Sequence, residues 1–223
     1  MSTPQGKTHR KINLADAARI IRDGGVLAYP TETFFALGAG LAFPAAMARV
    51  SKIKNRPAAK PLPLILGDLD QLAKILHPDF AAGPHFADLS ELMTVFWPGP
   101  LSLILPAGPD VPVQAKDGRG LTSVRLPGHA VARELCLAAD MPITATSANI
   151  SGKQAARLAS ELAADLPVDA VLDLGDAPAG GQASTVAAVR GNRELILLRP
   201  GAVSVAALEA AGFRVVVPGS TKI

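Results

Sequence analysis

The chain has 223 residues, enough for one fair-sized α/β domain and short for two. With 49% hydrophobic and 18% charged residues it has the composition of a folded protein, which excludes a disordered chain. The net charge of +3 permits contact with nucleotides or nucleic acid without requiring it, and the single cysteine excludes a disulfide within the chain.

Apolar spacing predicts helices and strands that alternate along the chain. In chain order we expect a helix over 13–24, a strand over 26–30, a helix over 44–55, a strand over 62–66, helices over 68–76 and 86–96, strands over 102–105 and 122–126, a helix over 130–140, a strand over 142–147, a helix over 155–165, strands over 171–175, 184–189 and 194–199, a helix over 204–212 and a strand over 213–217. Asn13 suits the N-cap and Gly24 the C-terminal stop of the first helix, and Asp68 suits a later cap.

Alternating strands and helices predict an α/β fold in which helices cover a sheet. The tight polar connection at residues 190–193 predicts a β-hairpin, so the sheet is expected to be mixed, with parallel and antiparallel strands. Residues 1–11 are expected to form a flexible arm and residues 12–223 a single domain, with no repeat and no interdomain linker.

The location of the protein is predicted from two further features. The N-terminal stretch MSTPQGKTHRKIN has no apolar h-region, and no run approaches the roughly 18 apolar residues that span a bilayer. We therefore expect a cytoplasmic protein without a membrane segment. Cys136 falls on the apolar stripe of a predicted helix, so we expect a buried residue there and not a nucleophile.

Familiar catalytic and metal motifs are absent from the sequence. It contains no GxxxxGK[ST] loop, no GxSxG elbow, no HExxH and no CxxC. The four histidines are scattered, which argues against a dedicated zinc site. What remains are five segments that combine turn residues with polar side chains in a way that a core does not need.

Two of these segments follow predicted strands. Thr31 and Thr33 come after the strand at 26–30, where ligands of open α/β sheets bind, although Thr31 capping an ordinary turn also explains them. Ser184 and Arg199 flank the predicted hairpin, and Pro200 favours an extended conformation for Arg199. The alternative for this last segment is a surface strand with an exposed arginine.

The most basic segment follows the helix predicted at 44–55. Pro57 disfavours helical geometry in the residue before it, so the helix should end near Asn55. In an extended tail Lys54 and Arg56 point the same way and can bind one polyphosphate. The alternative is that Lys54, Arg56 and Lys60 are solvated cations that compensate the helix C-terminus.

The other two segments place polar groups in and after apolar strands. Arg125 lies in an apolar run and needs a buried anion, either a structural carboxylate or that of a substrate. The strand at 142–147 leads into Thr146, Ser147, Asn149 and Ser151. Hydroxyl, amide and backbone N–H groups at a strand end suit a nucleotide, while an Asx or Ser turn before the next helix is the alternative.

Taken together, these segments resemble the YrdC family, the L-threonylcarbamoyladenylate synthases. PTET, WPGPLS, VRLPGH, SANISG and LRPG occur in the order expected for the family, from about Asn13 to Gly201. Lys54 and Arg56 match its KxR signature, and Ser147 and Asn149 match its SxN signature. Five or more such motifs in sequence make chance similarity a poor explanation.

The resemblance implies a twisted mixed sheet with a wide, basic, concave cavity, and an enzyme of the nucleotidyltransferase class. In the implied reaction, L-threonine and bicarbonate give N-carboxythreonine, which attacks the α-phosphorus of ATP. Pyrophosphate leaves, and threonylcarbamoyl-AMP passes to a tRNA threonylcarbamoyltransferase complex. Nucleotidyl transfer of this kind needs positioning and charge stabilisation more than a protein nucleophile.

Residue roles are carried over from the family position by position. Lys54, Arg56, Ser147 and Asn149 are assigned as catalytic residues that bind ATP, Arg199 as a further ATP contact, and Thr31, Arg125, Thr146 and Ser184 as threonine contacts, with Arg125 pairing the threonine carboxylate. Mg²⁺ is expected to arrive with ATP and to be held mainly by its phosphates, with no metal site formed by the protein itself.

The sequence departs from many members of the family at three places. Phe35-Ala36 stands where they have Tyr-Gly, Ala187-Ala188 stands where an acidic residue follows STV, and Gly67 stands where some carry a histidine. Longer members have a second C-terminal domain, so this chain is expected to be a single-domain form.

Two alternatives compete with the synthase interpretation. A non-catalytic module that binds double-stranded RNA would also suit a basic cavity, and weak RNA binding is compatible with either interpretation. A carbamoyl-adenylate enzyme of the hydrogenase-maturation type would carry acylphosphatase and zinc-finger segments, which this sequence lacks.

Overall fold

The computed structural model describes residues 9–57, 60–150 and 154–218. The helices are α1 (Leu14–Arg22), α2 (Pro44–Ile53), α3 (Pro78–Ala81), α4 (Phe86–Phe96), α5 (Ala130–Ala139) and α6 (Val205–Ala210), with 3₁₀ turns at Asp70–Lys74, Val113–Ala115 and Ala159–Glu161. The strands are β1 (Lys11–Ile12), β2 (Leu27–Pro30), β3 (Phe35–Gly38), β4 (Leu64–Ile65), β5 (Leu101–Pro106), β6 (Leu121–Arg125), β7 (Ile143–Thr144), β8 (Thr146–Ser147), β9 (Ala170–Leu172), β10 (Thr185–Gly191), β11 (Glu194–Arg199) and β12 (Arg214–Val216).

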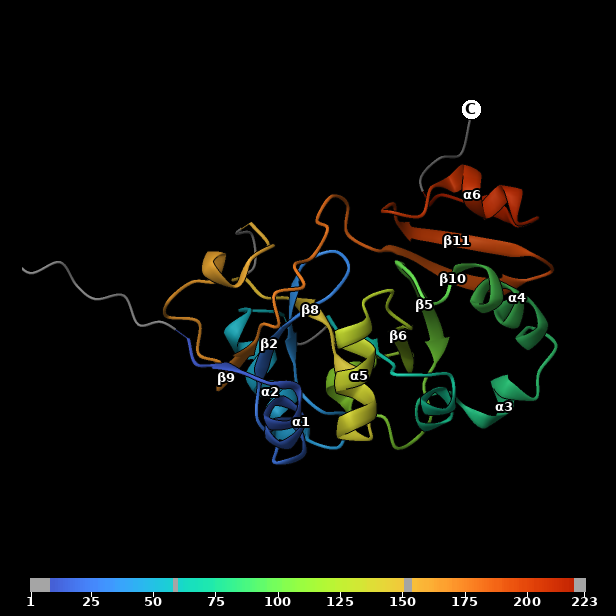
Figure 1. Cartoon of the computed structure of the whole chain (residues 1–223). Coiled ribbons are helices and arrows are strands. Elements are labelled where there is room, and N and C mark those ends of the chain that lie inside the picture. The colour runs from blue at the N-terminus through green and yellow to red at the C-terminus, as the bar shows by residue number, and fades with distance from the viewer. Residues whose placement is uncertain (1–8, 58–59, 151–153, 219–223) are drawn as a thin grey trace, which may run out of the picture.

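The strands form two sheets, where the sequence suggested one. A five-stranded sheet has the order β1-β9-β2-β3-β8, and a seven-stranded sheet has the order β12-β11-β10-β5-β6-β4-β7 (Figure 1). Both sheets contain parallel and antiparallel pairs, so the predicted mixed α/β architecture is confirmed. The division into two sheets was missed because strand periodicity does not show which strands pair.

The segment predicted as one strand at 142–147 passes from one sheet to the other. Its first part, β7, pairs antiparallel with β4 in the seven-stranded sheet. Its second part, β8, pairs antiparallel with β3 in the five-stranded sheet. At the junction Ala145 donates its backbone N–H to the carbonyl of Pro63. Residues on either side of this crossing therefore belong to different sheets.

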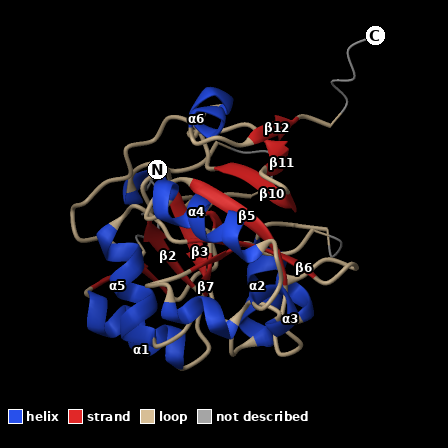
Figure 2. Ribbon diagram, turned by 90° about the vertical axis from the view of Figure 1, so that its right-hand side faces the viewer, coloured by secondary structure: helices blue, strands red, loops and turns tan. Residues whose placement is uncertain are grey.

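Helix α1 forms where the sequence predicts it, for local reasons. The Asn13 side chain accepts a hydrogen bond from the N–H of Asp16 at 2.9 Å and caps the helix. Gly24 follows the helix with φ +77°, the left-handed conformation that ends helices. The buried stripe of Ala17, Ala18 and Ile21 faces the five-stranded sheet, and α1 lies beside α5 (Figure 2).

The five-stranded sheet is covered on both faces, because alternate residues of its strands point in opposite directions. Leu27 and Tyr29 of β2 pack with the helices α1 and α5, whereas Val26 and Ala28 join the larger core cluster around α2 and the seven-stranded sheet. Tyr29 donates its hydroxyl to the carbonyl of Thr144, which links the two sheets inside the core.

Several predicted elements differ in the structure. In the segment 68–76 the predicted helix is replaced by the 3₁₀ turn Asp70–Lys74. There the Gln71 side chain accepts from the N–H of Gly67 and donates to the carbonyl of Cys136, and Pro78 follows shortly after. The helix predicted at 155–165 is replaced by the 3₁₀ turn Ala159–Glu161, where the Glu161 carboxylate accepts two backbone N–H groups. Strand β3 and the short helix α3 were not predicted.

The predicted ends of the chain lie partly beyond the described residues. Residues 1–8 of the expected arm are outside them, while Lys11 pairs with Val171 in the β1–β9 ladder. Ser151, at the end of the polar run after β8, also lies outside the described residues. Cys136 is fully buried, as expected, and burial raises the pKa of its thiol. Within the described ranges, no helix is long and apolar enough to cross a membrane.

Candidate active site

A cavity of about 770 Å³ lies between the two sheets. All nine residues predicted for the site line it: Thr31, Lys54, Arg56, Arg125, Thr146, Ser147, Asn149, Ser184 and Arg199. They come from the β2–β3 loop, the end of α2, the end of β6, the segment from β8 onward, and the two sides of the β10–β11 hairpin. The cavity is therefore assembled from distant parts of the chain, and Lys60 and the ion pair of Arg119 with Asp117 also belong to its lining.

The KxR and SxN pairs meet at the Lys54 ammonium. Lys54 Nζ donates to the carbonyl oxygens of Ser147 and Asn149 at 2.6 and 2.9 Å, and contacts their side-chain oxygens at 3.2 and 2.8 Å. The Ser147 hydroxyl in turn donates to Asn149 Oδ1 at 2.6 Å. The lysine thus holds the turn after β8 in place from the end of α2.

The sequence suggested that Lys54 and Arg56 lie in an extended tail, but in the structure the chain turns at this point. Lys54 is the C-cap of α2 with helical angles, and Asn55 has φ 48°, a left-handed conformation that ends the helix. The helix therefore ends close to the predicted position. This turn brings both Lys54 and Arg56 to the cavity wall.

Burial and a neighbouring cation weaken the proton affinity of Lys54. The residue is 4% exposed, and burial, followed by repulsion from Arg56, lowers the pKa of its ammonium from 10.5 to about 8. Burial also lowers the pKa of Arg56, which remains charged because a guanidinium loses its proton only at very high pH. An anionic ligand in the cavity would relieve this repulsion.

Backbone carbonyls hold the Arg56 side chain. Its Nε donates to the carbonyl of Lys60 and its Nη2 to that of Pro61, both at 2.9 Å. These two bonds fix the guanidinium at the edge of the cavity without neutralising it. Arg56 can therefore present a full positive charge to a phosphate.

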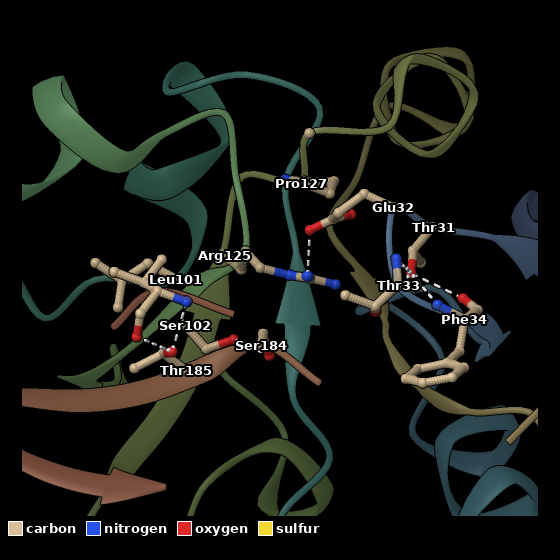
Figure 3. A network of polar contacts seen from close by, with 12 residues as sticks. Thr31, Glu32, Thr33, Phe34, Leu101, Ser102, Arg125, Pro127, Ser184 and Thr185 are labelled. Carbon is tan, nitrogen blue, oxygen red and sulfur yellow. Dashed lines mark hydrogen bonds and ion pairs between the residues drawn. The ribbon is translucent and has the colours of Figure 1, made fainter. Parts of the chain in front are cut away.

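Arg125 has an anionic partner from the protein itself, the structural carboxylate that was one of the two possibilities its sequence context left open. Its Nη1 donates to Glu32 Oε1, as Figure 3 shows, and the two side chains are 7% and 19% exposed. Glu32 was not among the predicted site residues, although it lies inside the PTET motif. The arginine in an apolar strand indicated that an acidic partner exists. The sequence pattern could not show which carboxylate it is, because Glu32 lies 93 residues away in the chain.

A third cluster joins Arg199 to two serines. Arg199 is exposed at the end of β11, yet its guanidinium donates to the Ser184 carbonyl at 2.7 Å and to the Ser184 hydroxyl at 3.0 Å. Ser184 Oγ lies 3.1 Å from Ser102 Oγ, and both hydroxyls are buried at the cavity wall. Although the residue as a whole is exposed, its guanidinium is partly buried against Ser184, and this desolvation, then repulsion from Arg125 and Arg56, lowers the pKa of Arg199. Ser102 belongs to the WPGPLS motif, but the sequence analysis did not name it as a site residue.

The two predicted threonines differ in how their hydroxyls are used. Thr31 Oγ1 donates to the carbonyl of Phe34 at 2.8 Å, so it stabilises the β2–β3 loop in the way the turn alternative described. Thr146 is 6% exposed in β8 and lines the cavity. Thr33, next to Thr31, is a further cavity residue. Direct contact of any of these hydroxyls with a ligand stays a prediction.

One of the departures from the family pattern lies at the site. Ala36 of β3 is the register partner of Ser147 in β8, and both Phe35 and Ala36 line the cavity. Ala187 is buried in β10 and Gly67 packs against Leu137 of α5, so these positions belong to the core.

Comparisons with known proteins agree on one family. Residues 19–201 match the Sua5_yciO_yrdC family model, whose description is "Telomere recombination". The chain is 35% identical over 201 residues to a threonylcarbamoyl-AMP synthase of Bacillus subtilis, an alignment covering 88% of this chain and 56% of the relative. It is 34% identical over 195 residues to a threonylcarbamoyl-AMP synthase of Pyrococcus abyssi, covering 86% and 55%. The chain spans about half the length of these curated relatives.

Solved structures agree with the sequence comparison. The structure of P. abyssi Sua5 complexed with L-threonine superposes with a TM-score of 0.80 at 32% identity, covering 93% of this chain and 61% of that one. Escherichia coli YciO has a TM-score of 0.66 at 23% identity, covering 86% and 94%, and supports the fold alone. The fold of this chain is thus shared with Sua5 and with YciO.

Proposed function

Because the chain belongs to the Sua5/YciO/YrdC family, we propose that it is an L-threonylcarbamoyladenylate synthase. It would convert L-threonine, bicarbonate and ATP into threonylcarbamoyl-AMP and pyrophosphate. The observation that carries the proposal is the contact of Lys54 with Ser147 and Asn149, which joins the two signature pairs in one cavity. Four arginines, Arg56, Arg119, Arg125 and Arg199, line the same cavity. The synthases of B. subtilis and P. abyssi, which are about one third identical, support it.

We assign the ATP end of the cavity to the signature pairs. Arg56 and Arg199 have guanidiniums fixed by backbone carbonyls, which suits recognition of phosphate oxygens. Lys54, Ser147 and Asn149 form a rigid polar turn beside them. Charge that develops at the α-phosphorus during transfer would be stabilised by these fixed cations. No protein nucleophile is needed for this step.

We assign the threonine end to Arg125, with Ser184, Thr146 and Thr31 nearby in the cavity. Arg125 has guanidinium N–H groups for the threonine carboxylate. In the proposed order, the threonine amine takes up the carboxyl group from bicarbonate with loss of water. The resulting carbamate oxygen attacks the α-phosphorus, and the bond to the pyrophosphate leaving group breaks.

Magnesium is expected to reach the cavity on ATP. In the described part of the chain no group of three or more His, Cys, Asp or Glu side chains is arranged to hold a metal ion. Mg²⁺ binds readily through phosphate oxygens and water, so the cavity needs to recognise only the metal–nucleotide complex. A tRNA threonylcarbamoyltransferase complex as the acceptor of the product, and a cytosolic location, follow from the same proposal.

The test is pyrophosphate release by the purified protein with ATP, Mg²⁺, bicarbonate and threonine. Release should require threonine and bicarbonate, and serine or valine should not replace threonine. Arg56→Ala and Asn149→Ala should each lower the rate by about 100-fold, the loss typical for a donor that stabilises transition-state charge. Lys52→Ala is the matched control, because Lys52 is exposed on α2 outside the cavity. Binding of ATP or duplex RNA without any release would favour a non-catalytic module.

A further inference from the structure

The ion pair between Glu32 and Arg125 joins the two walls of the cavity. Glu32 lies in the loop between β2 and β3 of the five-stranded sheet, and Arg125 is the last residue of β6 in the seven-stranded sheet (Figure 3). Arg125, Ser102 and Ser184 all line the cavity. The pair therefore connects the loop after β2 with the part of the cavity assigned to the amino acid.

The backbone on both sides of Glu32 is fixed. Thr31 donates its N–H and its hydroxyl to the carbonyl of Phe34, which closes the loop, and the Glu32 carbonyl accepts the N–H of Ala179 at 3.2 Å. These contacts hold the main chain of Glu32 at the position from which its carboxylate reaches Arg125.

The ion pair uses one N–H-bearing edge of the Arg125 guanidinium and one oxygen of the Glu32 carboxylate. Arg125 Nη1 donates to Glu32 Oε1, and this is the single hydrogen bond of the Arg125 side chain to the described residues. Glu32 Oε2 is buried and has no hydrogen-bond partner among those residues. An arginine–carboxylate pair built for stability usually forms two parallel bonds, and a buried carboxylate oxygen without a donor is costly. This geometry leaves the remaining guanidinium N–H groups for the cavity.

The electrostatics of the cavity give Glu32 a second role. Arg56, Arg125 and Arg199 lie close enough for repulsion from the other two to lower the pKa of Arg199. Of these three arginines, Arg125 is the one that forms an ion pair with a carboxylate in the described structure. Glu32 thus offsets part of the repulsion that Arg125 experiences from its positive neighbours.

We propose that Glu32 is a positioning residue, which holds one edge of Arg125 so that the other edge receives the carboxylate of the amino-acid substrate. The inference rests on the proposed function, because it assumes that threonine binds beside Arg125. It adds a residue that acts through Arg125 and does not itself touch the substrate. Removing Glu32 should therefore weaken amino-acid recognition and leave the ATP end unchanged.

The first experiment measures steady-state kinetics of pyrophosphate release for Glu32→Gln and Glu32→Ala. Glu32→Gln keeps an acceptor oxygen but loses the charge, and should raise KM for threonine by about ten-fold, as for a weakened charge-assisted hydrogen bond. Glu32→Ala should raise it further, while KM for ATP stays unchanged in both variants. Glu194→Gln is the matched control, since Glu194 also pairs with arginines, but its partners Arg190 and Arg214 do not line the cavity as Arg125 does.

A second experiment asks whether Glu32 acts through Arg125. In an Arg125→Gln background, Glu32→Gln should cause no further loss of threonine binding measured by calorimetry, because the coupled contact is already gone. Threoninol, which lacks the carboxylate, should bind the wild-type protein and Glu32→Gln equally. Additive losses, or equal weakening of threonine and threoninol, would overturn the inference.

These outcomes separate the inference from the proposed function. If the wild-type protein releases no pyrophosphate with threonine, the proposed function fails, whatever the variants do. If the wild-type protein turns over and Glu32→Gln keeps the wild-type KM for threonine, only the inference fails. A fall in kcat at unchanged KM, with a lower melting temperature, would mean that the pair is merely structural. Thermal unfolding of each variant supplies that check.

Discussion

Lys54 is the residue on which the candidate site depends most. It belongs to one of the two signature pairs and donates hydrogen bonds to both residues of the other pair, so a single ammonium joins α2 to the turn after β8. The pattern K-x-R marked it as a phosphate ligand, and the structure adds that it is buried and organises Ser147 and Asn149. The same lysine can thus shape the cavity and supply positive charge to it.

The lowered pKa of Lys54 predicts a pH dependence of ATP binding. Between about 8 and 10.5 the folded protein has lost a proton that the unfolded chain keeps, so stability without ligand should rise with pH across that window. ATP favours the charged lysine, so ATP affinity should fall as pH rises through about 8, with proton uptake on binding. Calorimetry in two buffers of different ionisation enthalpy measures that uptake.

Two variants decide the origin of this effect. Lys54→Arg keeps a charge that does not titrate in this range, so the proton uptake should disappear. Lys52→Arg, two residues earlier on the exposed side of α2, should retain it. Equal uptake in Lys54→Arg and the wild-type protein would mean that another group titrates.

At the scale of single elements, local sequence explains most of what forms. The cap at Asn13, the proline at the start of α2 and the left-handed Asn55 at its end place two helices near their predicted limits. The hairpin between β10 and β11 was predicted from its polar connection, and Asn192 and Arg193 have φ values of 51° and 57°, as a type I′ turn requires.

The left-handed conformation of Asn192 in this turn can be tested by substitution. Asn192→Val places a β-branched residue in the left-handed region and should destabilise the protein by about 1–2 kcal/mol. Asn192→Gly, which accepts that conformation, should change stability by only a few tenths of a kcal/mol. Urea unfolding measures both, at unchanged m value. Equal losses in the two variants would show that the Asn192 side chain, and not the backbone angle, matters.

At the scale of the whole molecule, the cavity exists because strands of two sheets meet around it. Residues of both sheets line it, and the crossing segment from β7 to β8 carries Thr146 and Ser147 from one sheet to the other. Buried contacts such as Tyr29 with Thr144 and Glu32 with Arg125 hold the sheets together. A ligand that fills the cavity would contact both sheets at once.

Ligands should therefore stabilise the whole protein. ATP with Mg²⁺ at 100 times its dissociation constant should add about 2.7 kcal/mol to the free energy of unfolding, as mass action requires. Threonine added with ATP should raise the melting temperature beyond either ligand alone. In Arg56→Ala the ATP-dependent shift should be reduced, while Lys52→Ala should show the full shift. A full shift in Arg56→Ala would remove Arg56 from the ATP site.

The sequence by itself determined the order and type of most elements, the α/β class and nine of the residues that line the cavity, because helix caps, strand periodicity and short motifs are encoded locally. Only the tertiary structure decided that the strands divide into two sheets, that segment 142–147 belongs to both, and that Glu32 pairs with Arg125. These features depend on contacts between residues far apart in the chain. Burial and competing backbone bonds settle such contacts, and no local pattern records them.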